Sequence, residues 1–236
     1  MVIAVQKGEG FDCVNCSSLK NYSVNEMYSI VSEIMNKNIK AEYALDKNYW
    51  KKYPQLFEGV YQIKDSILNA NVYFGREPII ECLEEGADIV VTGRAADSAL
   101  FLSPLMHEFK WSNDDYDNIA RGIIVGHLLE CGGQASGGNF DYAWRDVPDM
   151  DNLGFPIAEV TKNKTFITKT STTGGLITEQ SLKEQLLYEI HDPANYITPD
   201  IVADIIKVSL KEIEKNKVEV KNIKGKTPPE KLKLSI

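Results

Sequence analysis

The sequence lacks any apolar run approaching the roughly 18 to 20 residues that a membrane-spanning helix needs. Its first seven residues, Met1 to Lys7, also lack the basic flank and cleavable apolar stretch of a secretory signal. We therefore expect a soluble, cytoplasmic protein with no membrane partner.

Cysteine is scarce. The four cysteines, Cys13, Cys16, Cys82 and Cys131, are too few and too scattered for the disulfide framework of a small secreted domain. Cys13 and Cys16 have the spacing of a redox pair or half a zinc site, but the other two cysteines do not form a second pair. We expect a reducing compartment and no metal site.

The chain also lacks a positive net charge, and it lacks motifs that define a reaction. A net charge of −8 argues against a chain whose main partner is nucleic acid. The sequence contains no nucleophile-elbow Gly-x-Ser-x-Gly, no HExxH and no P-loop, so no motif names a reaction. What remains is ordinary globular composition, with 236 residues of which 43% are hydrophobic, enough for one large domain or two small ones.

The clearest structural pattern is helix, strand, helix in quick succession. Apolar spacing predicts a helix over 76–85, an apolar strand over 88–92 buried on both faces as in parallel sheets, and a second helix over 95–102. This order is typical of α/β layer architectures. We predict an α/β fold, with a mostly parallel sheet flanked by helices.

The C-terminal part reads differently. A helix over about 114–130 ends at Gly132 and Gly133, and a Gly- and Pro-rich stretch over 132–156 follows. The remaining elements predicted are strands at 156–160 and 165–168, a helix whose capping box is Ser181 with Glu184, and a β-hairpin over 208–223. We therefore expect an α/β domain over 1–131 and a smaller α+β part over 132–236.

The first candidate site follows the strand at 88–92. Gly93 permits a tight turn, and Arg94 together with free amides at the start of the next helix would attract an anion such as a carboxylate, a phosphate or a CoA diphosphate. Asp97 and Ser98 fall in that helix's first turn. There Asp97 is either a base or simply a complement to the helix dipole.

The second candidate site is the end of the helix over 114–130. His127 and Glu130 are three residues apart, so they share a helix face and can form an acid/base pair. Gly132 and Gly133 permit a ligand to approach the backbone, or they only relieve crowding where the helix ends. A histidine buried in the core or satisfied at a helix end is the plainer interpretation of His127.

A third candidate is a hydroxyl- and glycine-rich loop. Thr172, Thr173, Gly174 and Gly175 precede a predicted helix and have the composition of an oxyanion-binding loop. The same composition is common in plain turns, so both interpretations stay open.

At these same segments the chain resembles the acyclic terpene utilisation (AtuA-like) protein family. The resemblance rests on ordered strings at 71–75, 86–100, 104–109, 126–132, 152–159 and 183–193, among them Gly86-Ala87-Asp88-Ile89-Val90-Val91-Thr92-Gly93-Arg94-Ala95-Ala96-Asp97-Ser98 and Gly126-His127-Leu128-Leu129-Glu130-Cys131-Gly132. The family is tied to breakdown of acyclic isoprenoids such as citronellol and geraniol, in a pathway that runs on CoA thioesters. The resemblance thus implies a pathway and no mechanism.

The chain departs from the family pattern in two ways. Family members are longer at both ends, so the chain resembles the central portion of one. Their Asn-Gly turn after the strand matching Val2 to Val5 is replaced by Asn15-Cys16-Ser17-Ser18, which weakens the expectation of ligand binding there.

The leading hypothesis is a catabolic enzyme, or part of one, of the lyase or hydratase type. It would bind a branched carboxylate or its CoA thioester through Gly93, Arg94, Ser98, the Gly132–Gly133 turn and the 172–175 loop, and transfer protons through His127, Glu130 or Asp97. No cofactor is assigned. The alternatives are a non-catalytic subunit of a split complex, in a homo-oligomer or with a complementing chain, and a remnant that keeps the fold without turnover.

Overall fold

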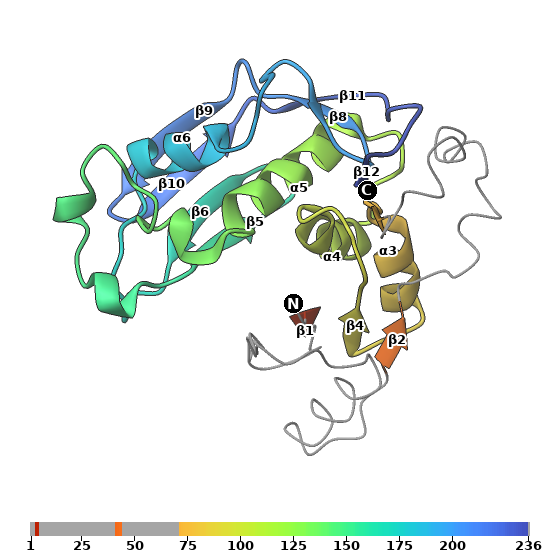
Figure 1. Cartoon of the computed structure of the whole chain (residues 1–236), viewed down its shortest axis with the longest axis horizontal. Helices are drawn as coiled ribbons and strands as arrows, with labels where there is room; N and C mark the ends of the chain where they lie inside the picture. The colour runs from red at the N-terminus through yellow and green to blue at the C-terminus, as the bar shows by residue number, and fades with distance from the viewer. Residues whose placement is uncertain (1–2, 5–40, 44–70, 236) are drawn as a thin grey trace. The chain divides into compact units, whose positions relative to one another are not determined.

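The computed structural model describes residues 3–4, 41–43 and 71–235, which belong to two compact units (Figure 1). The first comprises Met1–Ala95 and Lys231–Ile236, and the second comprises Ala96–Glu230. Within the described ranges, every helix is too short or too polar to cross a bilayer. The cysteine pair at 13 and 16 and the segment 15–18 lie outside the described residues.

The first unit contains short strands and one helix. Strand β4 (Ile89–Val91) pairs antiparallel with β1 (Ile3–Ala4) and parallel with β2 (Ala41–Tyr43), while β12 (Leu234–Ser235) pairs antiparallel with β3 (Asn71–Val72). Helix α3 (Glu77–Glu84) has a proline in its first turn, and Gly86 follows it with a φ of +78°. The left-handed glycine ends the helix and turns the chain toward β4.

The second unit is built on antiparallel strands. Its four-stranded sheet has the order β5-β6-β10-β9, and a three-stranded sheet has the order β11-β8-β7. The strands are β5 (Pro156–Val160), β6 (Thr165–Lys169), β7 (Tyr196–Ile197), β8 (Val202–Asp204), β9 (Ser209–Glu214), β10 (Lys217–Lys221) and β11 (Lys224–Lys226). The helices are α4 (Ala99–Phe109), α5 (Tyr116–Leu129) and α6 (Glu179–Leu187), and three short 3-10 turns lie between 132 and 152.

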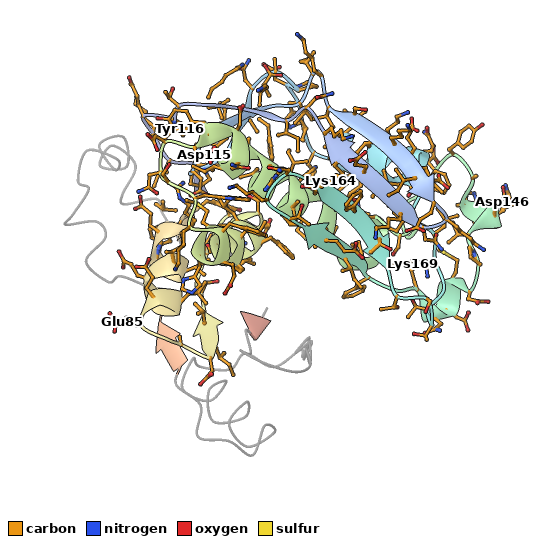
Figure 2. All side chains as sticks on the ribbon, turned by 180° about the vertical axis from the view of Figure 1, so that it is seen from behind. Glu85, Asp115, Tyr116, Asp146, Lys164 and Lys169 are labelled. Atoms are coloured by element: carbon orange, nitrogen blue, oxygen red, sulfur yellow. The ribbon has the colours of Figure 1, made fainter. Side chains whose placement is uncertain are left out.

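The core of this unit lies between the helices and the four-stranded sheet. Helix α5 packs beside α6, α5 contacts β5, and α6 contacts β9 (Figure 1). Fully buried apolar side chains from both layers meet there, including Ile123, Ile124, Leu182, Ile167 and Val218. Figure 2 marks Asp115 and Tyr116 at the start of α5, and Lys164 and Lys169 at the two ends of β6. Burial of these side chains, at about 1.5–3 kcal/mol each, is what holds α5 on the sheet.

The prediction of a mostly parallel sheet is wrong. Of the strand pairs in the described residues, all but the short β2–β4 pair are antiparallel. The helix, strand, helix succession before residue 110 is present, but the larger sheet is made by hairpins further along the chain, with short connections at 161–164 and 215–216. Such connections can join only antiparallel neighbours.

Two helix starts differ from those predicted. Helix α4 begins at Ala99 and not at Ala95, and it runs through Pro104 to Phe109. Helix α6 is capped by Thr178, whose hydroxyl accepts from the Ser181 amide, while the Ser181 hydroxyl accepts from the Thr178 amide. Serine has replaced the usual Glu of the capping box, so the motif begins three residues earlier than Ser181 and Glu184 suggested.

Helix α5 approaches its neighbours at van der Waals contact because glycines face them. A Cβ on Gly126 would lie 2.7 Å from the Cα of Ser98 and 2.8 Å from its carbonyl oxygen. Four residues earlier on the same face, a Cβ on Gly122 would lie 2.6 Å from the Cδ1 of Leu102. The absence of side chains at both positions therefore sets the separation of α4 and α5.

The start of α5 is held against β11 in the same manner. A Cβ on Gly225 would collide with the carbonyl of Tyr116. Beside this contact the Asp117 carboxylate accepts from the Gly225 amide at 3.0 Å and from the Lys224 ammonium at 2.6 Å. Burial alone would raise the pKa of Asp117, but these hydrogen bonds outweigh it and hold the pKa below its ordinary value.

We expect Gly126→Ala to destabilise the second unit, because its new Cβ meets backbone atoms that no rotamer change can move. The loss in free energy of unfolding should be about 1–3 kcal/mol in urea titrations. Gly122→Ala is the matched control: its Cβ chiefly meets the end of a leucine side chain, and alanine gains about 0.5–1 kcal/mol of helix preference. Equal losses in the two variants would contradict this account of the packing.

We expect Asp117→Asn to lower stability near neutral pH and to matter less in acid. The folded-state pKa lies below the unfolded one, so the carboxylate stabilises above the unfolded pKa, and this contribution is lost as pH falls through the folded pKa. Because the side chain is 51% exposed, the neutral-pH difference should stay below about 1 kcal/mol. Urea titrations across pH, with Asp146→Asn as control, measure it. A difference that grows on acidification would contradict the assignment.

Candidate functional site

The C-terminal end of α5 carries a buried acid/base pair. His127 is 1% exposed, and its Nδ1 lies 3.3 Å from the Oε1 of Glu130. The side chain of Glu130 is 12% exposed, so it is the member of the pair that reaches the surface. The two side chains thus lie close together, as their spacing of three residues on one helix face led us to expect, and their role as an acid/base pair stays a prediction.

The imidazole of His127 lacks the hydrogen bonds expected of so buried a polar group. Its contact with Glu130 is within ion-pair reach but does not have hydrogen-bond geometry, and in the described part of the chain neither imidazole nitrogen has a hydrogen-bond partner. The amide of Gln185 on α6 donates to the His127 carbonyl at 3.1 Å, while its own Oε1 also has no partner there. Buried polar atoms are nearly always paired, so this group of atoms requires a chemical explanation.

A half-buried tyrosine lies beside His127, and three carboxylates act on it electrostatically. The Tyr196 ring lies 5.4 Å from the His127 ring, centroid to centroid, with the planes tilted by 59°. Burial raises the pKa of Tyr196 strongly, and the carboxylates of Glu130, Asp97 and Glu189 raise it further. At neutral pH the phenol is therefore a hydrogen-bond donor and not an anion.

Cys131 belongs to the same cluster. Burial raises the pKa of the Cys131 thiol, and the Glu130 carboxylate raises it further, whereas a hydrogen bond from Gln185 acts in the opposite direction. Glu189 and Asp97 add smaller effects of the same sign as Glu130. A thiol with a raised pKa is a poor nucleophile at neutral pH, so nothing here favours cysteine-based catalysis.

We use the name acid/base cluster for Asp97, His127, Glu130, Cys131, Gln185, Glu189 and Tyr196, all in the second unit. The close contact of Gly126 with Ser98 holds the start of α4, next to Asp97, against α5, and the Asp97 carboxylate acts electrostatically on Tyr196 and Cys131. Glu189 has a φ of +59°, a conformation that costs a non-glycine residue roughly 1–2 kcal/mol. Strain of this kind is concentrated at functional sites.

Of the residues in this cluster, the sequence patterns singled out Asp97, His127 and Glu130, but not Gln185, Glu189, Tyr196 or Cys131. The first three lie on or next to one tightly packed helix pair, whereas Gln185 is 58 residues from His127 in sequence. A polar Gln185 on the apolar stripe of α6, beside buried Leu182 and Leu186, was the one available signal.

The two glycines after α5 pack against apolar side chains. Gly132 has a φ of +56°, and a Cβ there would lie 3.1 Å from the ring of Phe155, a side chain that is 58% exposed. Gly133 packs in the same way against Leu153. An exposed apolar ring therefore lies on the backbone two residues beyond Glu130.

Gly93 and Arg94 belong to the first unit, whereas the acid/base cluster belongs to the second. Both are exposed, and the Arg94 guanidinium lies 5.4 Å from the Tyr73 ring centroid, with the Lys233 ammonium at 5.3 Å from the same ring. Because α4 begins at Ala99, the amides of 93–96 are not the first turn of that helix, and Ser98 is its buried N-cap. Anion binding by Arg94 stays a prediction.

The 172–175 loop is hydrogen-bonded to the segment 148–152 and to Lys169. The amides of Gly174 and Gly175 donate to the carbonyls of Asn152 and Pro148, and Lys169 donates to the carbonyls of Thr170 and Thr173. The exposed Thr172 and half-buried Thr173 keep hydroxyls at the surface, but the two glycine amides are already used. Substrate binding by this loop stays a prediction, with hydroxyls and not amides as its donors.

Chemically, the acid/base cluster can hold and release protons. It offers a carboxylate at the surface, a buried imidazole behind it, and a neutral phenol as a donor. In the described residues no three His, Cys, Asp or Glu side chains are grouped so that they could hold a metal ion. We therefore derive no step through a metal.

We expect the Cys131 thiol to alkylate slowly at neutral pH and faster as the pH rises, because burial and Glu130 raise its pKa. Iodoacetamide labelling, followed by mass spectrometry of the Cys131 peptide across pH, gives the midpoint. Glu130→Gln should move that midpoint to lower pH, whereas Glu179→Gln, on the exposed start of α6, should not. An unchanged midpoint in Glu130→Gln would contradict the proximity of the two groups.

Comparison with known proteins gives one match. The family model described as "Acyclic terpene utilisation family protein AtuA" matches residues 21–236, which is most of the chain. No curated protein and no solved structure matched. The match confirms the resemblance inferred from the motif strings, and it implies involvement in acyclic terpene utilisation. The chain therefore belongs to the AtuA family of acyclic terpene utilisation proteins.

Proposed function

We propose that the chain is a catabolic enzyme of acyclic isoprenoid breakdown that transfers a proton to or from a branched carboxylate or its CoA thioester. The reaction would be of the lyase or hydratase type. The observation that carries the proposal is the His127–Glu130 pair, which is 3.3 Å apart, almost buried and incompletely hydrogen-bonded. Catalytic pairs are often loose without substrate and tighten in the complex.

Exposure supports different roles for the two residues. Glu130 reaches the surface and would exchange the proton with the substrate, whereas His127 lies behind it and would hold Glu130 in position and take up the change in charge. Tyr196 would donate a hydrogen bond to an oxygen that gains negative charge, because its phenol stays protonated. These roles give Glu130, His127 and Tyr196 each a task in one proton transfer.

The charge of the cluster favours a neutral reacting group. Asp97, Glu130 and Glu189 act together on Tyr196 and Cys131, so the local potential is negative and would repel a free carboxylate. A thioester has no charge at its reacting carbon, so the cluster fits it better than it fits the free acid. The exposed ring of Phe155 next to Gly132 would give a branched hydrocarbon chain an apolar surface.

The test is proton exchange on a panel of branched acyl-CoA thioesters in deuterated water, followed by mass spectrometry. Wild-type protein should introduce deuterium next to the thioester carbonyl or along the conjugated chain. Glu130→Gln should exchange at least about 100-fold more slowly, because it removes the base but keeps the size of the side chain. His127→Gln should also slow the exchange.

Glu179→Gln is the control, since Glu179 lies at the exposed start of α6, where it pairs with the exposed Lys183. Melting-temperature shifts with the same thioesters report binding independently of exchange. If Glu130→Gln exchanges as fast as wild type while both bind the thioester, the proposed role of the cluster is wrong.

A further inference from the structure

Lys226 is the last residue of β11, and it forms a polar network outside the acid/base cluster. Its strand pairs antiparallel with β8, and β8 pairs in turn with β7, the two-residue strand that carries Tyr196. In this register Lys226 is opposite Val202, and Tyr196 is opposite Ala203. Lys226 and Tyr196 are therefore on the two outer strands of one small sheet.

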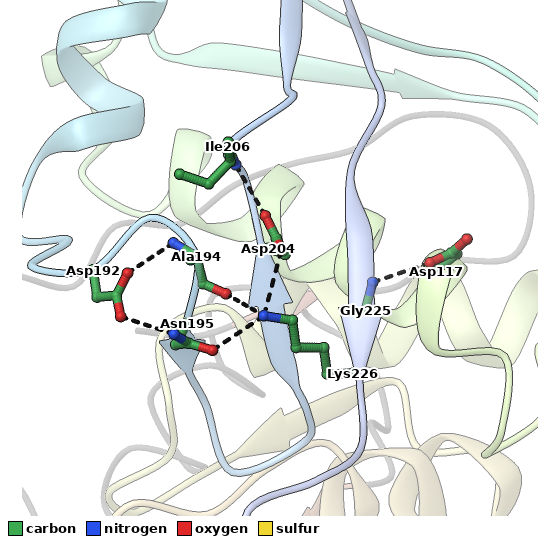
Figure 3. Close-up of polar contacts among 8 residues, drawn as sticks. All are labelled: Asp117, Asp192, Ala194, Asn195, Asp204, Ile206, Gly225 and Lys226. Atoms are coloured by element: carbon green, nitrogen blue, oxygen red, sulfur yellow. Dashed lines mark hydrogen bonds and ion pairs between the residues drawn. The ribbon is translucent and has the colours of Figure 1, made fainter.

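The Lys226 ammonium bridges that sheet to the segment before Tyr196. It donates to the Ala194 carbonyl at 2.7 Å and to the Oδ1 of Asn195 at 3.1 Å, and it lies 3.4 Å from the Oδ2 of Asp204 (Figure 3). Two of the three oxygens belong to the residues immediately before Tyr196. Lys226 therefore binds the segment before Tyr196 in addition to pairing with Asp204.

Asp192 fixes the same segment from the other side. Its carboxylate accepts from the Ala194 amide at 2.9 Å and from the Asn195 Nδ2 at 2.8 Å (Figure 3). The side chain of Asn195 is therefore held at both ends, by Asp192 through its nitrogen and by Lys226 through its oxygen. A strand of only two residues has little pairing of its own, so these contacts decide where it lies.

The direction of Tyr196 depends on this placement. Side chains alternate along β7, and Asn195 and Ile197 are exposed while Tyr196 is half-buried and faces His127. A shift of one residue in the pairing would turn Tyr196 outward and Ile197 inward. The oxygens bound by Lys226 are those that a shift would displace.

We infer that Lys226 is a positioning residue, which fixes the 194–195 segment so that the Tyr196 hydroxyl stays in the acid/base cluster. The inference rests on the proposed function of that cluster. Lys226 does not touch the reacting group; it acts through Asn195 and the register of β7.

The Lys226→Met variant distinguishes a positioning role from a simple charge effect through the pKa of Tyr196. Loss of a nearby cation by itself would raise the pKa of Tyr196 further, because the phenolate would lose a favourable interaction. Movement of the ring out of its buried place, away from Glu130, Asp97 and Glu189, would lower the pKa toward the ordinary value of about 10. The two explanations thus predict shifts of opposite sign.

The experiment compares Lys226→Met, Lys226→Arg and Lys183→Met in the full chain. Lys183 is the matched control, with a similarly exposed ammonium that pairs with Glu179 on its own helix. Nuclear magnetic resonance of ring-labelled tyrosine, assigned with Tyr196→Phe, follows the ionisation of Tyr196 in alkali. We expect a lower pKa in Lys226→Met, wild-type behaviour in Lys183→Met, and recovery in Lys226→Arg, whose guanidinium can also reach carbonyl and amide oxygens.

Deuterium exchange on the thioester panel is the second readout, and Lys226→Met should slow exchange at least fivefold without weakening thioester binding. Asn195→Ala, which removes the bridging side chain and keeps Lys226, should reproduce both effects if Lys226→Met does not fold. An unchanged or raised Tyr196 pKa in a folded Lys226→Met protein would overturn the inference. Absence of exchange in the wild type would overturn the proposed function instead, while the Tyr196 readout would still judge the role of Lys226.

Discussion

The close contact between α5 and the backbone at Ser98 is the constraint on which the second unit depends. Gly126 permits it, and the contact brings Asp97 toward the end of α5, where His127 and Glu130 lie. At the other end, Gly225 permits β11 to touch the start of the same helix. One helix, held at both ends by glycine contacts, therefore carries the acid/base pair and sets the distance to the groups around it.

Accumulated negative charge gives the cluster its chemical character. Carboxylates from the start of α4, the end of α5 and the turn after α6 act on the same phenol and the same thiol, and they raise the pKa of both. Such an arrangement costs stability, because the like-charged carboxylates repel one another. Its cost is understandable if the cluster moves protons on a neutral substrate, as proposed above.

The fold was only partly predictable. The hairpin over 208–223, the strands at 156–160 and 165–168 and the helix ending near Glu130 follow from local patterns and are present in the structure. The prediction of a mostly parallel sheet is wrong, because the apolar pattern at 88–92 describes only the short strand β4, whereas the larger sheet is built from antiparallel hairpins further along the chain. The predicted helix start beside Gly93 and Arg94 is also wrong: α4 begins at Ala99, about one turn later, so the amides at 93–96 are not those of its first turn.

What the sequence by itself determined is local: family membership from ordered motif strings, and the approach of His127 to Glu130, which any helix through both residues enforces. What only the tertiary structure decided is long-range. Gln185 and Tyr196 meet the end of α5, and Lys226 bonds the segment before Tyr196, through strand register and helix packing; sequence spacing says nothing about such contacts. The physical reason is that helix geometry repeats within one turn, whereas partners far apart in the sequence, such as Gln185 and His127 at a separation of 58 residues, are chosen by the packing of the whole unit.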